Sequence, residues 1–541
     1  MSAPASDRLD AIVIGAGFAG IYMLHKLRNE LGLRVLAFEK ADGVGGTWYW
    51  NKYPGACSDV DGIVYRYSFD RELLRELMPE SRYVPQAQTL ALLNEVVDRN
   101  NLRGDIRFGT GVVGLTFDED RNEWTVRTDD GAEYVSCYVV GALGPLSERN
   151  FPEIEGRESF AGRLVHTGAW PDDLDITGKR VGVIGTGSTG TQFICAAAPV
   201  AGHLTVFQRS PQYVVPAGNG PLGADYLAQV RDGYDAIWEQ VYESRVGCGF
   251  QESDVPAMSV SAAERTRVFE QAWQAGSGFR FMFGTFGDIA FDPDANEAAA
   301  AFIRAKIAAT VRDPETARLL TPTGYYAKRP ICNDGYYDAY NRDNVKLVSV
   351  KENPIQRITP AGVVTADGVE HQLDVLVFAT GFDAIEGSYD RIDVRGSGGR
   401  TLREHWSEAP TTYLGVATNG FPNLFMVFGP NSVFCNLPPG IESQVEWISD
   451  LIAAAEQRGA ARVETTVAAE DGWTQTCRGI AEASLFAKVD SWIFGANIPG
   501  KKPRTLFYFG GLGTYRRTLR ESAAADFDGF VFGGREVPAA V

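Results

Sequence analysis

The sequence predicts an α/β protein built from two domains that share one plan, with a helical insertion in the second domain. Two observations lead to this prediction. A short apolar strand, a glycine-rich turn, a helix and a second strand follow one another at 10–39 and again at 179–209, and each unit is followed by a matching closing strand. Strand–helix–strand units of this kind form Rossmann-like nucleotide-binding domains. The chain of 541 residues is therefore expected to contain two of them.

The first unit, DAIVIGAGFAGIYMLHKLRNELGLRVLAFEK, carries the pattern Gly-x-Gly-x-x-Gly at Gly15, Gly17 and Gly20. Phe18 begins the apolar spacing of the helix that follows and is also predicted to contact FAD. The glycines would let the backbone approach a pyrophosphate at the helix N-terminus. Glu39, at the end of the second strand, can accept hydrogen bonds from ribose hydroxyls. This unit is therefore predicted to bind FAD.

The second unit repeats the glycine pattern at Gly185, Gly187 and Gly190. Arg209 stands at the place that Glu39 has in the first unit. A guanidinium there can bind a 2′-phosphate, which a carboxylate would repel, so this unit is predicted to bind NADPH rather than NADH. The loop residues predicted to contact NADPH are Gly185, Thr186, Gly187, Ser188 and Thr189.

The closing strands and their spacing along the chain predict the domain boundaries. The stretches DGAEYVSCYVVGALG and DGVEHQLDVLVFATG align without gaps, and each is typical of a hairpin arm followed by a buried strand. The second unit has a longer interval before its closing strand, with helical stretches such as NEAAAAFIRAKIAATV. The predicted domains are 1–145 (FAD domain, first part), 146–178 (linker), 179–220 with 326–382 (NADPH domain), 221–325 (helical insertion) and 383–541 (FAD domain, second part, with a substrate-lining region).

The composition excludes several classes of protein. The 51 basic and 69 acidic residues give a net charge of −18, and such a surface repels phosphate backbones, so no nucleic-acid partner is expected. No apolar run reaches the ~20 residues that cross a bilayer, and no export signal is visible, which predicts a cytoplasmic protein without a membrane span. The seven cysteines include no close pair, so neither a redox disulfide nor a metal site is predicted. The oligomeric state stays open, with a monomer favoured.

Two dinucleotide sites on one chain imply hydride transfer from NADPH to a flavin. A disulfide reductase would need a close cysteine pair after the first glycine loop, where only Cys57 occurs. The electrons are therefore expected to pass to a diffusible acceptor, which is oxygen, a quinone or an organic molecule.

One stretch ahead of the second glycine loop narrows this choice. FAGRLVHTGAWP places Phe160, Gly162, His166, Trp170 and Pro171 in a pattern that resembles the fingerprint of the type I Baeyer–Villiger monooxygenases. These flavoproteins insert an oxygen atom beside a ketone carbonyl. The stretches GGTWYWNKYPG, GVIGTGSTG, AKRP, ATGFDA, QVEWISD and SWIFGANIPGKK are similar in order and spacing to the cyclohexanone monooxygenases of this family. The resemblance covers nearly the whole chain.

The resemblance implies a reaction as well as a fold. NADPH would reduce FAD, and oxygen would add to the flavin to give a C4a-peroxyflavin. That group would attack a cyclic or linear ketone, and the tetrahedral Criegee-type adduct would rearrange to a lactone or an ester. The partners implied are therefore a small-molecule ketone and O2.

The same resemblance assigns roles to four charged residues. Arg329 matches an arginine that stabilises the peroxide and the adduct, and Asp59 matches the carboxylate that positions this arginine beside FAD. Lys328 matches a lysine that helps Arg209 to bind the 2′-phosphate of NADPH. Without the resemblance, Arg329 could equally form a surface ion pair and Asp59 could serve a turn.

The resemblance implies roles for further residues. Trp492 matches a residue near the nicotinamide and the substrate, and Gly46, Thr47 and Trp48 match contacts of FAD. His166 matches a hinge residue that couples domain movement to turnover without touching the substrate. Isolated histidines are otherwise satisfied core or surface residues.

The predicted substrate pocket is apolar, and the chain departs from its cyclohexanone-oxidising relatives around it. Cys248 stands where a larger apolar residue is usual, and Pro145 stands where leucine is usual. These departures leave ring size and regiochemistry open. The other departures are Ser432, Val433, Cys435 and Gly440. The residues predicted to line the pocket are Pro145, Leu146, Cys248, Phe279, Phe434, Cys435, Leu437 and Phe507.

Three alternative functions remain open at this point. The chain could oxidise nitrogen or sulfur, although Trp170-Pro171 and the pair of Asp59 and Arg329 argue against this. It could also be an NADPH oxidase that releases hydrogen peroxide. The third alternative is a nucleotide-sensing flavoprotein that signals by changing shape and shows no stimulation by ketones.

Overall fold

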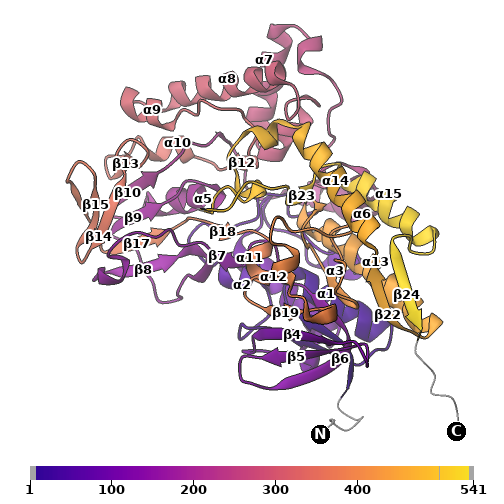
Figure 1. Cartoon of the computed structure of the whole chain (residues 1–541). Helices are drawn as coiled ribbons and strands as arrows, with labels where there is room; N and C mark the ends of the chain where they lie inside the picture. The colour runs from indigo at the N-terminus through magenta and orange to yellow at the C-terminus, as the bar shows by residue number, and fades with distance from the viewer. Residues whose placement is uncertain (1–7, 499, 535–541) are drawn as a thin grey trace, which may run out of the picture.

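Two sheets organise the protein (Figure 1), and the computed structural model describes residues 8–498 and 500–534 of the chain. The larger sheet has the strand order β19-β4-β5-β6-β1-β2-β3, with β20 paired to β6. Its parallel part brings β2 and β6 to either side of β1, whose residues Ala11–Ile14 are buried. The strands are β1 Leu9–Ile14, β2 Val35–Phe38, β3 Ile106–Arg107, β4 Val112–Asp118, β5 Glu123–Thr128, β6 Glu133–Gly141, β19 Asp393–Arg395 and β20 Leu424–Met426.

The second sheet is parallel throughout, in the order β13-β10-β9-β17-β8. Its strands β9 and β17 are buried and apolar apart from Arg180 at the start of β9, as expected for a sheet that is covered on both faces. Its strands are β8 Arg163–His166, β9 Arg180–Ile184, β10 His203–Gln208, β13 Val345–Ser349 and β17 Val375–Phe378. The predicted α/β class with two nucleotide-binding sheets is confirmed. The segment 146–178 was expected to be a linker, yet it contributes the edge strand β8, because the backbone of 163–166 pairs with β17.

The helices of the segment 221–325 are α6 Ala224–Glu243, α7 Ala262–Ala275, α8 Pro293–Thr310 and α9 Pro314–Leu320. Two of them begin at a capping aspartate followed by proline, namely α8 at Asp292 and α9 at Asp313. Helices α7 and α8 pack into the core of the second domain. Helix α6 instead packs against the first domain, where Trp238 joins a cluster with Val60 and Val64. The expected single insertion in the second domain is thus shared between the two domains.

The C-terminal region returns to the first sheet. Strands β19 and β20 pair with β4 and β6. Helix α13, Leu437–Arg458, lies against α1, Phe18–His25, in one continuous core. Figure 1 shows α13 beside α15, Leu512–Ala524, and α14, Val467–Glu482, on the flank of the molecule that carries α6. The domain boundaries proposed from the sequence remain a prediction.

The chain crosses between the two sheets twice, and the two crossings pair with each other. Strand β7, Glu148–Arg149, follows β6, and strand β18, Phe382–Asp383, follows β17. They form a two-stranded antiparallel ribbon in which Phe382 is paired with Arg149 and Asp383 with Glu148. This pair of strands is called the crossing ribbon below. Within the two described ranges, no helix has the length and apolar character needed to cross a membrane.

The position of α6 can be tested by truncating its buried anchor. Trp238→Ala should destabilise the protein by about 3–5 kcal/mol, because it opens a cavity in the cluster that joins α6 to the first domain. Urea unfolding followed by tryptophan fluorescence measures the effect. Tyr226→Ala, an exposed position on the same helix, is the control and should shift the midpoint little. Equal shifts for the two variants would contradict the docking of α6.

Candidate active site

The first glycine loop packs so closely against its neighbours that it has no room for side chains. Its surface is therefore formed by backbone atoms. Gly15 has φ of +107°, and a Cβ atom there would lie 2.5 Å from the carbonyl oxygen of Ala142. A Cβ atom on Gly46 would lie 2.9 Å from the Cα atom of Gly17. The turn 15–17 and the turn at Gly46 thus form one bare cradle at the N-terminus of α1. This arrangement fits the pyrophosphate of a dinucleotide.

Glu39 closes this cradle on the side of β2. Its carboxylate accepts hydrogen bonds from the backbone amides of Ala16, at 2.8 Å, and Ala41, at 2.9 Å. Burial raises the pKa of Glu39, and the two amide hydrogen bonds oppose that rise. The side chain is therefore fixed next to the glycine loop, where it can receive ribose hydroxyls.

The other predicted FAD contacts directly follow the two turns of this cradle in the chain. Thr47 and Trp48 start the short helix α2, Thr47–Trp50, directly after Gly46. The indole of Trp48 is buried and donates to the hydroxyl of Tyr65 at 3.3 Å. Phe18 packs edge-on against Tyr65, with ring centroids 5.6 Å apart.

The second glycine loop has the same construction at the end of β9. Gly185 has φ of +109°, and a Cβ atom there would lie 2.4 Å from the carbonyl oxygen of Ala379. Gly187 faces open space, since nothing would lie within 4 Å of a Cβ atom on it. Ser188 and Thr189 begin helix α5, Ser188–Ala197, whose N-terminus points to that space. The loop therefore fits the pyrophosphate of a second dinucleotide.

A cationic cavity of about 170 Å³ lies at the carboxyl edge of the second sheet, lined by Arg209, Lys328 and Lys351 among others. Burial lowers the pKa of Lys328, and the positive charge of Arg209 lowers it further. Two cations that are held close together in this way favour an anion between them, as the 2′-phosphate of NADPH would provide.

Lys351 was not predicted from the sequence, although a signal for it exists. Strands β10 and β13 are parallel neighbours, with Gln208 paired to Ser349. Residues that follow the carboxyl ends of adjacent parallel strands meet at one edge of the sheet. Lys351 follows β13 as Arg209 follows β10, so sheet order, rather than spacing along the chain, brings the two together.

Asp59 and Arg329 form a two-pronged ion pair between the domains. One guanidinium nitrogen of Arg329 lies 2.7 Å from Oδ1 of Asp59, and the other bonds Oδ2. The hydroxyl of Ser188, at the start of α5, donates to the same carboxylate at 3.3 Å. Burial alone would lower the pKa of Arg329, but the facing carboxylate raises it well above its usual value. The side chains of Arg329 and Asp59 stay 23% and 17% exposed, so the fixed cation remains accessible beside Ser188 of the second glycine loop.

A second cavity, of about 240 Å³, lies on the other side of Asp59, and Cys57, Cys195 and Cys332 contribute to its walls. Burial raises the pKa of each of these thiols to about 12. They are therefore protonated and unreactive at neutral pH. Among the residues that the structure describes, no three His, Cys, Asp or Glu side chains are placed to hold a metal ion.

An aromatic wall extends from the ion pair toward the C-terminal region. The guanidinium of Arg329 lies 5.1 Å from the ring centroid of Phe279. Phe434 is 6.5 Å from Phe279 and 5.8 Å from Phe507, measured between ring centroids. Trp492 lies 6.0 Å from Phe507. These aromatic side chains, with the buried Cys248, border one apolar region beside the cation.

The other predicted pocket residues pack against the domain cores or lie at the first crossing, and their place in the pocket remains a prediction. Leu437 and Cys435 pack against the core of the first domain, and Leu146 packs against the core of the second. Pro145 lies at the start of the first crossing, where its carbonyl accepts the amide of Ile385 at 2.8 Å. Phe509 belongs to the wall, with its ring centroid 5.4 Å from that of Phe434, and was missed. Its alternation with Phe507 in TLFYFG was the available signal.

The residues near α13 that differ from those usual in the cyclohexanone-oxidising relatives lie in the protein interior. The hydroxyl of Ser432 is buried and accepts a hydrogen bond from the side-chain amide of Gln444 at 2.9 Å. Val433 is likewise completely buried. Gly440 is needed for packing, because a Cβ atom there would lie 2.8 Å from both the sulfur of Cys435 and the ring of Phe428.

His166 lies at the end of β8, away from the aromatic wall, with 2% of its surface exposed. Its Nδ1 accepts from the amide of Gly168 at 3.0 Å, so Nε2 carries the proton and donates to the carbonyl of Gly381 at 3.1 Å. Burial lowers the pKa of His166 to about 4. The neutral ring therefore fastens β8 to the residue just before β18, which fits a role at the crossing ribbon rather than in the chemistry.

Comparisons with known proteins agree with this architecture. Residues 9–231 match the family model described as pyridine nucleotide-disulphide oxidoreductase. The chain is 60% identical over 522 residues to the phenazine N-monooxygenase PhzNO1 of Lysobacter antibioticus, with 96% of each chain covered. It is 54% identical over 510 residues to a Baeyer-Villiger monooxygenase of Pseudooceanicola batsensis, with 94% of each covered. The crystal structure of cyclohexanone monooxygenase from Rhodococcus sp. Phi1 bound to NADP+ matches with a TM-score of 0.97, at 57% identity, over 98% of this chain and 99% of that one.

The cationic cavity predicts a cofactor preference that can be measured. Lys351→Met should raise the KM for NADPH about tenfold and leave the KM for NADH unchanged, because only NADPH places a phosphate against the lysine. Steady-state NADPH and NADH oxidation measures both constants. Lys179→Met, an exposed lysine outside the cavity, is the control. An equal rise in the KM for NADH would show that Lys351 does not contact the 2′-phosphate.

The buried ring of His166 predicts a specific dependence of stability on pH. Its folded-state pKa of about 4 lies below the unfolded value, so the unfolded state binds the proton first as the pH falls. The contribution of the neutral ring is fully present above about pH 6.5 and shrinks by about 2 kcal/mol on going to pH 4.5. His166→Gln lacks this titration. The stability advantage of the wild type, measured by thermal melting, should therefore narrow between pH 7.5 and pH 4.5, whereas a constant gap would refute the assignment.

Proposed function

We propose, because the chain belongs to the Baeyer–Villiger monooxygenase family, that it uses NADPH and O2 to insert one oxygen atom beside the carbonyl of a ketone. FAD and NADPH are the cofactors of this enzyme. The product of the reaction is an ester, or a lactone when the ketone is cyclic. The observation that carries the proposal is the ion pair of Asp59 and Arg329, which holds a permanent cation beside Ser188 of the second glycine loop and against an aromatic wall.

The described residues fit both cofactors. When bound, FAD supplies the activation of oxygen and NADPH supplies the reducing hydride. The FAD cradle consists of Gly15, Gly17 and Gly46, closed by Glu39. The NADPH cradle consists of Gly185, Gly187, Ser188, Thr189, Arg209, Lys328 and Lys351.

Arg329 and Asp59 are proposed to act on the charge that develops during the reaction. Attack on a ketone carbonyl turns its oxygen into an anion, and a fixed guanidinium stabilises such an anion without reorganising. Asp59 accepts two hydrogen bonds from Arg329, so it fixes the orientation of that cation. The aromatic wall around Phe279 and Phe434 would keep water away from the reacting groups.

A second candidate function is the N-oxidation of a flat aromatic heterocycle. The relative at 60% identity is named a phenazine N-monooxygenase. The rings of Phe279, Phe434 and Phe507 offer a surface on which a planar substrate could stack. Oxidation of a ring nitrogen creates no alkoxide on the substrate, so this reaction would depend less on Arg329 than ketone oxidation does. The monomeric state and the cytoplasmic location remain predictions.

The proposal is tested by tracing oxygen. With cyclohexanone, NADPH and oxygen-18 gas, the purified enzyme should yield ε-caprolactone that carries one labelled oxygen atom, detected by mass spectrometry. Phenazine in a parallel reaction tests the second candidate. Arg329→Lys should lower lactone formation by about 10²–10³-fold, because a single amine cannot make the two-pronged contact with Asp59.

Arg280→Lys is the matched control for that variant. Arg280 lies over Phe250, with 5.1 Å between the guanidinium and the ring centroid, and it takes no part in the pair of Asp59 and Arg329. Lactone formation should change little in this variant. NADPH-dependent hydrogen peroxide release without labelled product from any ketone would refute ketone oxygenation and favour the oxidase.

A further inference from the structure

We propose that Asp383 and Glu386 are positioning residues for Trp492. Through Lys501 and Arg504, they fasten the segment that carries Trp492 to the crossing ribbon between the two sheets. The attachment of the Trp492 segment is argued from contacts within this chain alone. The effect of that attachment on turnover rests on the proposed function.

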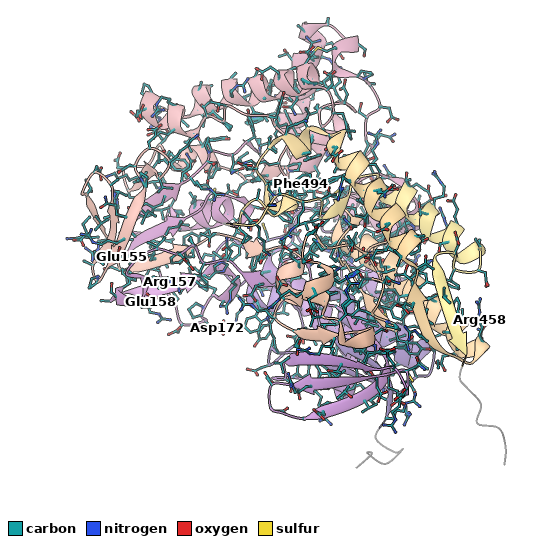
Figure 2. All side chains as sticks on the ribbon, viewed as in Figure 1. Glu155, Arg157, Glu158, Asp172, Arg458 and Phe494 are labelled. Atoms are coloured by element: carbon teal, nitrogen blue, oxygen red, sulfur yellow. The ribbon has the colours of Figure 1, made fainter. Side chains whose placement is uncertain are left out.

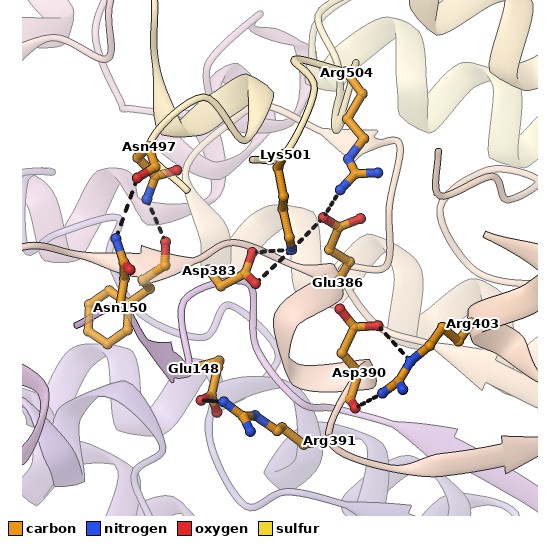
Figure 3. Close-up of polar contacts among 11 residues, drawn as sticks. Glu148, Asn150, Asp383, Glu386, Asp390, Arg391, Arg403, Asn497, Lys501 and Arg504 are labelled. Atoms are coloured by element: carbon orange, nitrogen blue, oxygen red, sulfur yellow. Dashed lines mark hydrogen bonds and ion pairs between the residues drawn. The ribbon is translucent and has the colours of Figure 1, made fainter. Parts of the chain in front are cut away.

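Four charged side chains form a compact network (Figure 3). Lys501 donates to both carboxylate oxygens of Asp383, at 2.7 and 2.6 Å, and to Glu386 at 2.7 Å. Arg504 donates to the same oxygen of Glu386 at 2.5 Å. The two acids belong to β18 and to the following turn, α11, Glu386–Tyr389. The two cations come from the C-terminal region, more than one hundred residues further along the chain.

This network is shielded from solvent more than an ordinary surface ion pair. The side chain of Glu386 is 7% exposed, and those of Lys501, Asp383 and Arg504 are 16–20% exposed. Burial alone would lower the pKa of Lys501, and its bonds to Asp383 and Glu386 raise it above the usual value. Removing either cation would leave a shielded carboxylate without full compensation, and such losses are costly.

Neutral hydrogen bonds extend the network toward Trp492. The side-chain amide of Asn497 donates to the carbonyl of Phe382 at 2.8 Å. The backbone amide of Arg504 donates to the carbonyl of Phe494 at 3.0 Å. Phe494 closes the 3₁₀ turn that begins at Trp492, and Figure 2 shows it in the middle of the molecule, where it is buried. The orientation of the turn is thus tied to β18.

The ribbon end of the network is itself fixed by His166. The imidazole donates to Gly381, which directly precedes β18. Three consecutive residues therefore accept these bonds: the carbonyl of Gly381 accepts from His166, the carbonyl of Phe382 from Asn497, and the carboxylate of Asp383 from Lys501. A shift of the crossing ribbon would change the position of the turn that holds Trp492.

A cavity of about 400 Å³ borders the network, and its walls are charged residues that include Arg391, Arg403 and Asp390. Dissolved ions can reach the network from this side. Screening should weaken the attachment as the ionic strength rises, because only part of each pair is shielded.

The attachment is tested by hydrogen exchange on the purified FAD-bound enzyme. Lys501→Met should raise the exchange rates of peptides from 491–498 about tenfold, because the segment loses its ion pairs with Asp383 and Glu386. Lys501→Arg keeps the charge and should stay near the wild-type rates. Raising NaCl from about 0.05 to about 0.5 M should speed exchange in the wild type but add little in Lys501→Met.

Arg391→Met is the matched control. Arg391 lies on the wall of the same cavity and pairs with Glu148, but its side chain is 70% exposed and does not contact the C-terminal segment. Its removal should change exchange in 491–498 by less than about twofold. Glu386→Gln, which keeps the shape of the acid, is a second variant expected to follow Lys501→Met.

Turnover gives an independent readout of position. In Lys501→Met, a larger share of the oxidised NADPH should end as hydrogen peroxide, with a rise of about fivefold over the wild type and over Arg391→Met. Unchanged exchange in both Lys501→Met and Glu386→Gln, or equal changes in Arg391→Met, would overturn the inference. If no ketone is oxygenated, the exchange measurements still decide it, so its failure is distinguishable from failure of the proposed function.

Discussion

The ion pair between Asp59 and Arg329 is the interaction on which the rest of the site depends. Asp59 follows the FAD-side loop, whereas Arg329 precedes β12, Ile331–Cys332, on the side of the second domain. The pair forms only when the two domains are packed together. It gives the protein a fixed cation where the two domains meet. Neighbouring groups, from the hydroxyl of Ser188 to the ring of Phe279, are arranged around it.

The backbone parts of the site were predictable from the sequence because they follow from local geometry. Gly15 and Gly185 combine positive φ angles with close approach to a neighbouring strand, so no other residue fits there. Such requirements leave a pattern at fixed spacing, and the same is true of the strands that flank the loops. The fold class and both cofactors could therefore be derived before any coordinates were known.

The parts that were missed depend on which elements become neighbours. Lys351 reaches the cavity of Arg209 only because β13 pairs with β10. Helix α6 joins the first domain because the face that carries Trp238 matches the apolar surface around Val64. Spacing along the chain contains none of this information.

The double crossing between the sheets has a consequence for how the protein is made. All strands of the second sheet lie between Arg163 and Phe378. The first sheet is complete only after β20, which ends at Met426, has been synthesised, and α1 is covered only when α13 follows. A ribosome therefore releases every strand of the second sheet while the first sheet is still incomplete. The sheet that begins the chain should be the last to be completed, and its exposed apolar surface is what a chaperone would meet during synthesis.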